Sequence, residues 1–246
     1  MAIPEYLLNE LDSIDSTNNY AMKLLDANKA HNGMTITARN QWAGKGQRGK
    51  TWLDAEGQSL LMSIITGPGR PIQDQFIFSA TIAVAVAKFL QNFNNGWQVN
   101  IKWPNDIIIN DKKAGGILIE NVLRGNKWAN SVIGLGLNIN QAALPDDLPY
   151  AISLTIASGK EFAINELRDG IWEGIMKAIS EQAESAKVMD AYNELLYKKG
   201  MMQKLGDNTK VYQARIVRVN EDGTLSVQLE DGIIVNYQHG QVEWVW

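Results

Sequence analysis

A basic, glycine-rich stretch, AGKGQRGKTW at residues 43–52, has the residue types best suited to chemistry in this sequence. Its glycines, its second lysine and its threonine match the phosphate-loop pattern G-x-x-x-x-G-K-[ST] at every fixed position. Four cations and no acid lie between Arg39 and Trp52. Glycines let backbone N–H groups face an anion, and an indole ring can cover a base. The stretch therefore predicts a loop that binds a phosphate or a nucleotide.

A P-loop nucleoside triphosphatase is one interpretation of this loop, but the flanking sequence argues against it. The pattern requires a helix that starts at the Lys-Thr pair and continues for several turns. Here Gly57 follows six residues after Thr51, and residues 61–66 then predict a mostly buried strand. P-loop domains also have parallel sheets, whereas turn residues farther along this chain predict hairpins. We therefore expect a glycine loop of another kind and keep the P-loop as an alternative.

Three more stretches combine small or strand-breaking residues with polar ones. KWPNDIII, residues 102–109, has a proline, an amide and a carboxylate in an otherwise apolar strand, which indicates a bulge beside a site, with a plain turn between two strands as the alternative. KKAGG, residues 112–116, has two lysines at a turn and two glycines that permit a close approach. IGLGLNIN, residues 133–140, has glycines at alternate positions on one strand face, where another group can pack. Each stretch alone also has a purely structural explanation.

The composition excludes several classes of chemistry. The 246 residues include no cysteine, which rules out disulfides, thiolate metal sites and cysteine nucleophiles. The two histidines, His31 and His239, are far apart in sequence, so we expect neither a histidine metal site nor a Ser-His-Asp triad. The formal net charge of −4 gives no sign of a nucleic-acid or membrane partner. Residues 1–16 do not resemble a signal peptide and no stretch has the roughly 18 apolar residues of a membrane span, so a cytoplasmic protein is expected.

The chain changes in texture near residue 198. Before it, Ser16 and Thr17 predict the start of a helix. The hydrophobic periods predict helices at about 18–27, 75–93 and, in two pieces, 165–197. They also predict strands at 34–38 and 61–66 and strand-like runs from 99 to 139. After it, β-branched runs alternate with Asp-Gly turns, as in a small β-barrel. We therefore expect a large domain at residues 1–197 and a small one at 198–246.

Taken together, the motifs resemble those of the biotin–protein ligase family. The matches occur in family order and cover most of residues 12–140: the STN triplet at 16–18, Gln41 with GKGQRGKTW, KWPND, K-x-x-G at 113–116, and GLGLNIN. The resemblance implies an α+β fold, with a class II synthetase-like catalytic domain whose mixed, largely antiparallel sheet is flanked by helices. It also implies a small C-terminal SH3-like β-barrel.

The resemblance implies a two-step ligase reaction. Biotin and ATP, with Mg²⁺ near the phosphates as activator, give biotinyl-5′-AMP and pyrophosphate. The biotinyl group then passes to one lysine of a biotin carboxyl carrier protein. A carboxylate has to approach a triphosphate, and one cation about 4 Å from an anion contributes on the order of 4 kcal/mol at an effective dielectric of 20. The chemistry needs no Cys, Ser or His nucleophile and no prosthetic group, in agreement with the composition.

The resemblance also assigns residue roles, position by position. Lys113 and Arg48 are the expected catalytic cations, with Lys113 directed at the biotin carboxylate and then at the α-phosphate or the acyl carbonyl. The expected biotin-binding residues are Ser16, Thr17, Asn18, Gln41, Gly44, Lys45, Gly46, Gln47, Lys113 and Gly116. The expected ATP- or adenylate-binding residues are Lys50, Trp52, Asn105, Asp106 and Asn138. No protein metal ligand is expected, and the glycine loop is expected to close over the adenylate.

Two departures from the family pattern matter. The family loop often reads G-R-G-R-x-G, and here Lys45 and Gln47 replace both arginines, which predicts weaker retention of the adenylate. The STN triplet begins at Ser16, which leaves no room ahead of it for the helix-turn-helix domain of bifunctional members. We therefore expect a monofunctional enzyme that does not bind DNA. Pairing of two copies through the main-domain sheet is also expected.

Three rival functions remain open at this point. Lipoate ligases and lipoyl or octanoyl transferases share the architecture, but the transferases need a cysteine and lipoate ligases lack this combination of motifs. A P-loop nucleotide hydrolase would release phosphate rather than pyrophosphate. A non-catalytic biotin or adenylate sensor would not need the Lys113 cation beside a reacting carboxylate.

Overall fold

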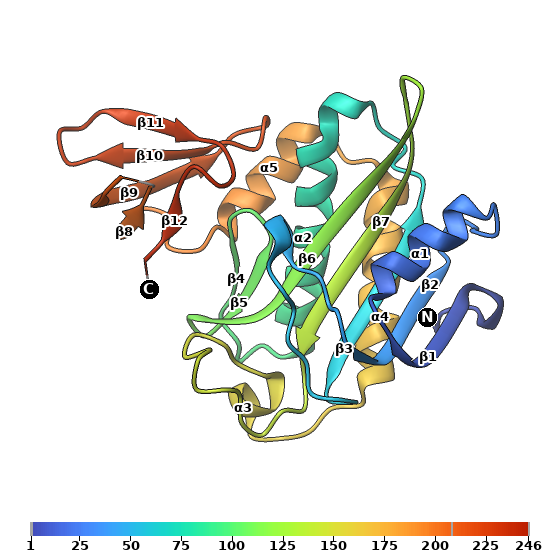
Figure 1. Cartoon of the computed structure of the whole chain (residues 1–246). Coiled ribbons are helices and arrows are strands. Elements are labelled where there is room, and N and C mark those ends of the chain that lie inside the picture. Colours follow the sequence, from blue (N-terminus) through green and yellow to red (C-terminus); the bar gives the residue numbers. More distant parts are fainter. Residues whose placement is uncertain (1, 208, 246) are drawn as a thin grey trace.

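The computed structural model describes residues 2–207 and 209–245 and contains two sheets, the larger flanked by helices (Figure 1). Seven strands form the main sheet in the spatial order β1-β2-β3-β7-β6-β5-β4. In chain order they are β1 Leu8–Ile14, β2 Thr35–Gln41, β3 Ser59–Thr66, β4 Val99–Lys102, β5 Asp106–Ile109, β6 Lys112–Arg124 and β7 Lys127–Asn138. β1 and β2 pair in parallel and the other neighbours are antiparallel. The sheet is therefore mixed and largely antiparallel, which confirms the prediction.

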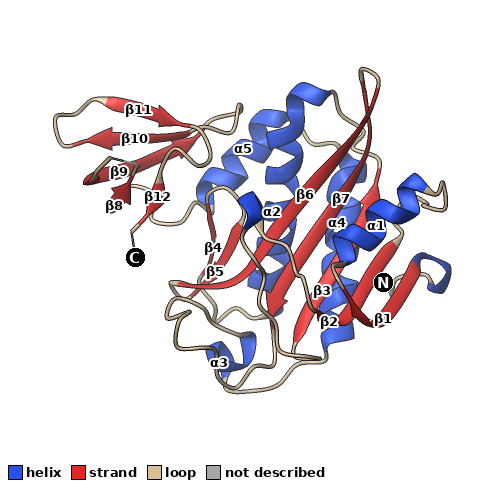
Figure 2. Ribbon diagram, in the orientation of Figure 1, coloured by secondary structure: helices blue, strands red, loops and turns tan. Residues whose placement is uncertain are grey.

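Helices lie on both faces of this sheet (Figure 2). They are α1 Thr17–Asp26, α2 Gln75–Phe93, α3 Leu154–Ser158, α4 Ile164–Glu181 and α5 Ser185–Glu194, with 3-10 turns η1 Glu5–Leu7, η2 Gln47–Gly49 and η3 Ile72–Asp74. α2 has the predicted bounds, and the helical stretch predicted at 165–197 is α4 and α5. The sequence does not predict β1 or α3, because β1 is a half-exposed edge strand and α3 has only five residues.

Alternate residues of the central strands separate the two faces of the main sheet. Ile133, Leu135 and Leu137 of β7 belong to the core that includes α2 and α4. Gly134 and Gly136 lie between them in sequence and therefore face the opposite side, of which α1 covers only a part. One face of the sheet thus forms the core, and part of the other face is available for a site.

Helix α2 lies at the centre of that core. Together with η3 it forms an apolar segment, Ile72–Phe93, which by length and by its mean hydropathy of 1.5 could cross a membrane. The sequence analysis does not expect such a segment. However, 56% of the tested window is buried inside the fold, where α2 packs against α4, α5 and β4. Its apolar character is therefore explained by the core.

The C-terminal part of the chain forms a second, five-stranded antiparallel sheet. Its strands are β8 Met202–Gly206, β9 Val211–Val219, β10 Leu225–Leu229, β11 Ile234–Tyr237 and β12 Glu243–Trp244. Asn193 of α5 exchanges two hydrogen bonds with the backbone of Val219, at 2.7 and 2.9 Å. Tyr197 N still donates to Ile101 O of β4 at 2.9 Å. We therefore propose to keep the domain boundary after residue 197.

Residues 103–105 form a hairpin turn between β4 and β5, which is the structural alternative given for the KWPNDIII stretch. Lys102 and Asp106 form the last pair of the hairpin, and the Trp103–Pro104 peptide bond is cis. Pro104 has no N–H to donate, so it fits in the turn and not in the ladder. The expected bulge lies in the same stretch, because the register between β5 and β6 shifts between Ile107 and Ile108. The fully buried Tyr192 of α5 donates its hydroxyl hydrogen to Pro104 O at 2.9 Å. This hydrogen bond attaches the turn to α5.

Replacing Tyr192 with phenylalanine removes this buried hydrogen bond and leaves the carbonyl oxygen of Pro104 without its donor. We expect the free energy of unfolding to fall by about 1 kcal/mol. Urea denaturation measures this change. Tyr6→Phe is the control, because the Tyr6 side chain is 79% exposed, and equal effects of the two substitutions would contradict the role given to Tyr192.

Candidate active site

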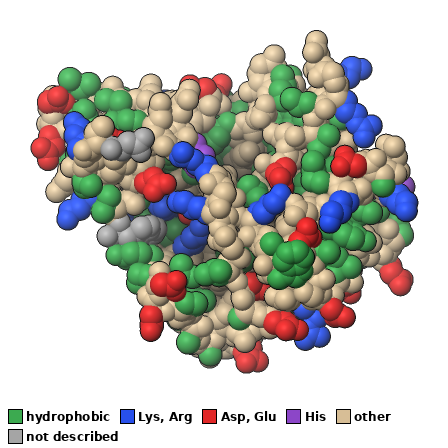
Figure 3. Space-filling model, in the orientation of Figure 1, with side chains coloured by type: hydrophobic (Ala, Val, Ile, Leu, Met, Phe, Trp, Pro, Cys, Tyr) green, Lys and Arg blue, Asp and Glu red, His purple; other side chains and the backbone are tan. Residues whose placement is uncertain are grey.

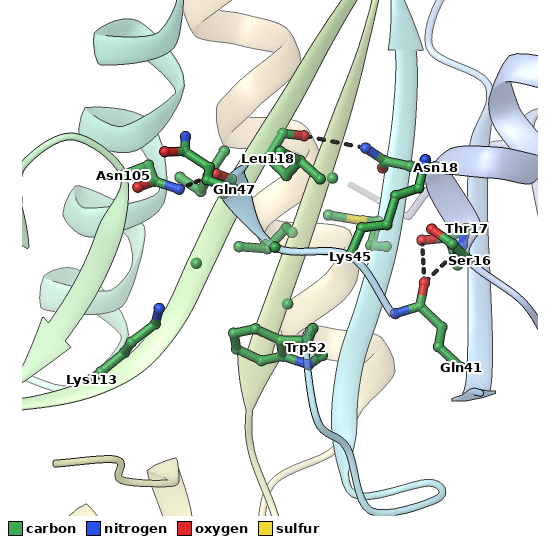
Figure 4. Close-up of a pocket in the computed structure, with 17 residues that line it drawn as sticks. Ser16, Thr17, Asn18, Gln41, Lys45, Gln47, Trp52, Asn105, Lys113 and Leu118 are labelled. Carbon is green, nitrogen blue, oxygen red and sulfur yellow. Dashed lines mark hydrogen bonds between the residues drawn. The ribbon is translucent and has the colours of Figure 1, made fainter. Parts of the chain in front are cut away.

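The open part of the main sheet holds a cavity of about 60 Å³, here called the central cavity (Figure 4). It lies between the start of α1, the glycine loop (residues 43–52) and the central strands. Its lining residues are Ser16, Thr17, Asn18, Gln41, Lys45, Gly46, Gln47, Trp52, Met62, Asn105, Lys113, Gly116, Ile117, Leu118, Gly134, Leu135 and Gly136. Of the residues predicted to bind biotin, Gly44 is the one not among them. It packs against Trp52, whose backbone oxygen leaves no space for a side chain there.

Glycines form the floor of the central cavity. Gly116 of β6 pairs with Gly136 of β7, and Leu118 pairs with Gly134. A Cβ atom on Gly136 would lie only 2.6 Å from the Trp52 ring, so the indole rests directly on the strand backbone. The prediction that another group packs on this strand face is therefore confirmed, and Trp52 is one such group.

Uncharged polar side chains lie at one end of the central cavity (Figure 4). Gln41 Oε1 accepts hydrogen bonds from the backbone N–H of Thr17 at 2.7 Å and from its hydroxyl at 3.0 Å. The Ser63 hydroxyl lies 2.7 Å from Thr17 Oγ1 and 2.6 Å from Asn18 Oδ1. Ser16 precedes α1, but its side chain makes no capping bond, so Gln41 caps this helix instead. The amide nitrogen of Gln41 is thus the group that remains to meet a ligand.

Lys113 lies at the other end of the central cavity and forms an ion pair (Figure 4). Its Nζ is 2.7 Å from Asp106 Oδ1, and Lys102 Nζ is 3.9 Å from Asp106 Oδ2. Burial lowers the pKa of Lys102, and Asp106 partly opposes this effect. Two lysines therefore surround one carboxylate. This end of the cavity suits an anion, whereas the opposite end offers uncharged hydrogen-bonding side chains, with the Lys45–Glu120 ion pair beside Asn18.

The glycine loop crosses the central cavity as an irregular segment. Gln47–Gly49 forms a single 3-10 turn, in which Arg48 has a φ of 54°, and no helix follows before β3 begins. β2 and β3 on either side of the loop are antiparallel. A P-loop needs a long helix at this position and a parallel sheet, so the P-loop alternative is wrong.

Ion pairs fasten the glycine loop to both sheets. Lys45 Nζ lies 3.7 Å from Glu120 Oε1 of β6, whose other oxygen accepts a 2.7 Å hydrogen bond from Asn18. Lys50 Nζ lies 3.3 Å from Glu243 Oε1 of β12, and both of these side chains are largely exposed. The first pair is less exposed and should hold the loop more strongly.

A second space, here called the loop cavity, adjoins the central cavity. It has a volume of about 220 Å³ and lies between the segment that follows the glycine loop and residues 141–151. Trp52 and Lys113 line both cavities, and Asn138 lines the loop cavity. Lys113 therefore lies where the two spaces meet.

A third space of about 240 Å³, here called the interlobe cavity, lies between the glycine loop and the C-terminal sheet. Arg48, Lys50, Lys102 and Asp106 line it. Burial lowers the pKa of His239, which also lines it, and the neighbouring Arg48 and Lys50 act in the same direction. Figure 3 shows the basic side chains gathered beside the hollow between the two sheets. The predicted cations Arg48 and Lys50 thus lie apart from Lys113.

The sequence analysis missed functional candidates that depend on tertiary packing. Glu120 has a usable signal, because it alternates with Leu118 and Gly116 on β6 and so belongs to the cavity face. Lys102 stands in the KWPND stretch, but its burial does not follow from the sequence. His239 reaches the site only because the C-terminal sheet packs there. In the part of the chain that the structure describes, no three His, Asp or Glu side chains form a metal-binding group.

Comparison with known proteins identifies the family. Residues 10–138, more than half of the chain, match the model of the biotin/lipoate A/B protein ligase family. The chain belongs to this family.

Individual relatives of the biotin/lipoate ligase family agree with this assignment. The bifunctional ligase/repressor BirA of Bacillus spizizenii is 30% identical over 231 residues, which cover 90% of this chain and 69% of that protein. The biotin–[acetyl-CoA-carboxylase] ligase of Paracoccus denitrificans is 32% identical over 133 residues, 54% of this chain and 53% of that one. The biotin protein ligase of Aquifex aeolicus, solved with biotin and ATP, superposes with a TM-score of 0.80 at 22% identity, covering 97% of this chain and 98% of that chain. The predicted family, fold and ligase class are thereby confirmed.

Replacing Glu120 with glutamine removes the charge that holds Lys45 and should loosen the glycine loop. We expect trypsin to cleave the loop at its basic residues several-fold faster than in the unaltered ligase, with protection restored by biotin and ATP together. Time-resolved mass spectrometry of the digest measures this. Glu243→Gln is the control, because its ion pair with Lys50 is exposed and should contribute little. Equal cleavage of the Glu120 variant and the unaltered chain would show that this ion pair does not fasten the loop.

Proposed function

We propose that this ligase activates biotin with ATP and transfers the biotinyl group to a lysine of a biotin carboxyl carrier protein. Family membership supports the reaction class, and relatives named as biotin ligases support the acid substrate. The observation that carries the proposal is the position of Lys113, the cation shared by the central and loop cavities. A carboxylate in the first cavity and a nucleotide in the second would meet beside it.

The two ends of the central cavity favour biotin over lipoate. The ureido head of biotin carries a carbonyl and two N–H groups, which suit the hydrogen-bonding end formed by Thr17, Asn18 and Gln41. Its apolar chain suits the glycine floor, and its carboxylate suits the Lys113 end. The dithiolane ring of lipoate has no strong hydrogen-bonding atoms and would leave that polar end unused.

The nucleotide is proposed to occupy the other two cavities. The loop cavity, with Trp52, Asn138 and apolar residues, suits an adenine base. The interlobe cavity, with Arg48, Lys50 and Lys102, suits the leaving phosphates. The described residues offer no acidic cage for a metal ion, so Mg²⁺ is proposed to enter on the phosphates of ATP as part of the substrate.

The chemistry follows from this arrangement. A carboxylate oxygen of biotin attacks the α-phosphorus, a new P–O bond forms, and the bond to pyrophosphate breaks. In the second step the amine of the carrier lysine attacks the acyl carbonyl, AMP leaves, and the amine loses a proton. Lys113 neutralises charge in both steps, so catalysis consists mainly of positioning and charge stabilisation. Closure of the glycine loop keeps water from the mixed anhydride.

The remaining expectations concern the surroundings of the enzyme. A cytoplasmic location agrees with the absence of cysteine and with a carrier that belongs to a biotin-dependent carboxylase. Pairing of two copies through the main sheet stays a prediction, and β1 and β4 are the edge strands at which it would occur.

Exchange of labelled pyrophosphate into ATP tests the first step. We expect exchange with biotin and none with lipoate. Lys113→Ala should reduce the exchange rate by roughly 100-fold to 1,000-fold, because one preorganised charge is lost. Lys112→Ala is the matched control, since this neighbouring lysine is exposed and lines none of the three cavities. Absence of exchange with either acid would overturn the proposed function.

Retention of the intermediate tests the role of Gln47, which lines both the central and interlobe cavities and has a buried side-chain oxygen without a hydrogen-bond partner. An arginine at position 47 would place a guanidinium at the interlobe cavity, where the phosphates are proposed to bind. We expect Gln47→Arg to slow the release of biotinyl-AMP by roughly tenfold, as a charge-assisted hydrogen bond allows. Filter binding of labelled intermediate gives the rate, with the exposed Gln98→Arg as control. Unchanged or faster release would disprove this role.

A further inference from the structure

Arg48 differs from the other cations of the interlobe cavity in what surrounds its charge. Lys50 pairs with Glu243 at 3.3 Å, and Lys102 pairs with Asp106 at 3.9 Å. Among residues 2–207 and 209–245, Arg48 takes part in no ion pair, and its backbone has a φ of 54°. Such a left-handed conformation is uncommon outside glycine and persists where the surroundings fix it. Something other than a carboxylate therefore has to hold Arg48.

The turn between β11 and β12 makes this contact. Gly240, in that turn, has a φ of 89°, and the absence of a side chain leaves room for the Arg48 guanidinium against the backbone. A Cβ atom on Gly240 would occupy the space of Nη1 of Arg48. An acidic side chain in this turn would neutralise the guanidinium, whereas the glycine holds it and leaves its charge available to an anion.

The turn that meets Arg48 is itself attached to the main sheet. His239, next to Gly240, packs edge-on against Trp103 of the β4–β5 hairpin, with ring centroids 5.8 Å apart. The indole N–H of the buried Trp103 donates to Gly223 O at 2.9 Å, which attaches a second turn of the C-terminal sheet to the same side chain. Gly240 therefore has a fixed position relative to the hairpin that carries Lys102.

We propose that Gly240 is a positioning residue for the adenylation step, because it admits the Arg48 guanidinium to the interlobe cavity and holds it where the leaving pyrophosphate would bind. The inference rests on the proposed function, which places the phosphates of ATP in that cavity. Arg48, His239 and Gly240 all line it. Negative charge moves onto pyrophosphate as its bond to the α-phosphorus breaks, and a cation fixed beforehand stabilises that charge without reorganisation. Gly240 acts only through Arg48.

Alanine substitutions at two glycines test the inference by biotin-dependent pyrophosphate exchange. Gly240→Ala should displace Arg48 and lower kcat/KM for ATP by roughly tenfold to 100-fold, as misplacement of a catalytic group by about 1 Å allows, and leave KM for biotin unchanged. Gly232→Ala is the matched control, because Gly232 also lies in a turn of the C-terminal sheet, has a φ of 86° and offers open space to a Cβ atom. Both variants should unfold at a reduced temperature, but Gly232→Ala should keep its kinetics with ATP.

Removal of Arg48 separates positioning from a purely structural role. Arg48→Ala should lower kcat/KM for ATP at least as much as Gly240→Ala, and the double variant should show little further loss, because the displaced group is gone. If Gly240→Ala alone does not fold, the double variant should fold.

Four results would each overturn the inference while exchange with biotin in the unaltered enzyme still supports the ligase. They are unchanged kinetics with ATP in Gly240→Ala, an equal kinetic loss in Gly232→Ala, losses that multiply in the double variant, and a double variant that fails to fold together with Gly240→Ala. Absence of exchange in the unaltered enzyme would instead remove the proposed function.

Discussion

Three glycines on one face of two paired strands determine how the site is built. Gly116 and Gly136 lie directly opposite each other on β6 and β7, and Gly134 follows one step along the same face. Trp52 and Asn18 can therefore approach the sheet backbone itself. A larger residue in place of Gly136 would displace the indole of Trp52, and one in place of Gly134 would displace Asn18 at the start of α1. Either change would alter the shape of the central cavity. The glycine loop, the STN triplet and the sheet are thus fitted to one another.

Basic side chains surround the glycines of β6 and β7, an arrangement that suits a reaction between two anions. Lys113 lies between the central and loop cavities, whereas Arg48, Lys50 and Lys102 gather in the interlobe cavity. Asp106 pairs with Lys113 at 2.7 Å in the absence of ligand and keeps the cation in place. A carboxylate and a phosphate could share that cation without any side chain acting as nucleophile.

The sequence predicts the strongly periodic elements and the members of the site, but not the contacts that hold them. The bounds of α2 are predicted correctly, because its apolar residues extend along the whole helix, Gln75–Phe93. The half-exposed β1 gives no such signal. The KWPNDIII stretch contains both a turn and a register shift, and its residue types alone could not decide between the two.

The same limit applies within the candidate site. The motifs bring Ser16, Gln41, Lys45 and Lys113 to one cavity, as expected from the resemblance. Glu120 belongs to no motif, because its importance depends on partners from distant segments, Lys45 of the glycine loop and Asn18 of α1. Local patterns therefore predict which segments meet, while the ion pairs and the unpartnered atoms require the three-dimensional structure.

Two ion pairs, one on each sheet, hold the glycine loop in place. One anchor, Lys45 with Glu120, lies on the main sheet, and the other, Lys50 with Glu243, lies on the C-terminal sheet. The second pair is largely exposed and contributes little, so the strength of attachment differs between the two ends of the loop. The end near Lys50 should therefore separate from the C-terminal sheet more often than the end near Lys45 separates from the main sheet.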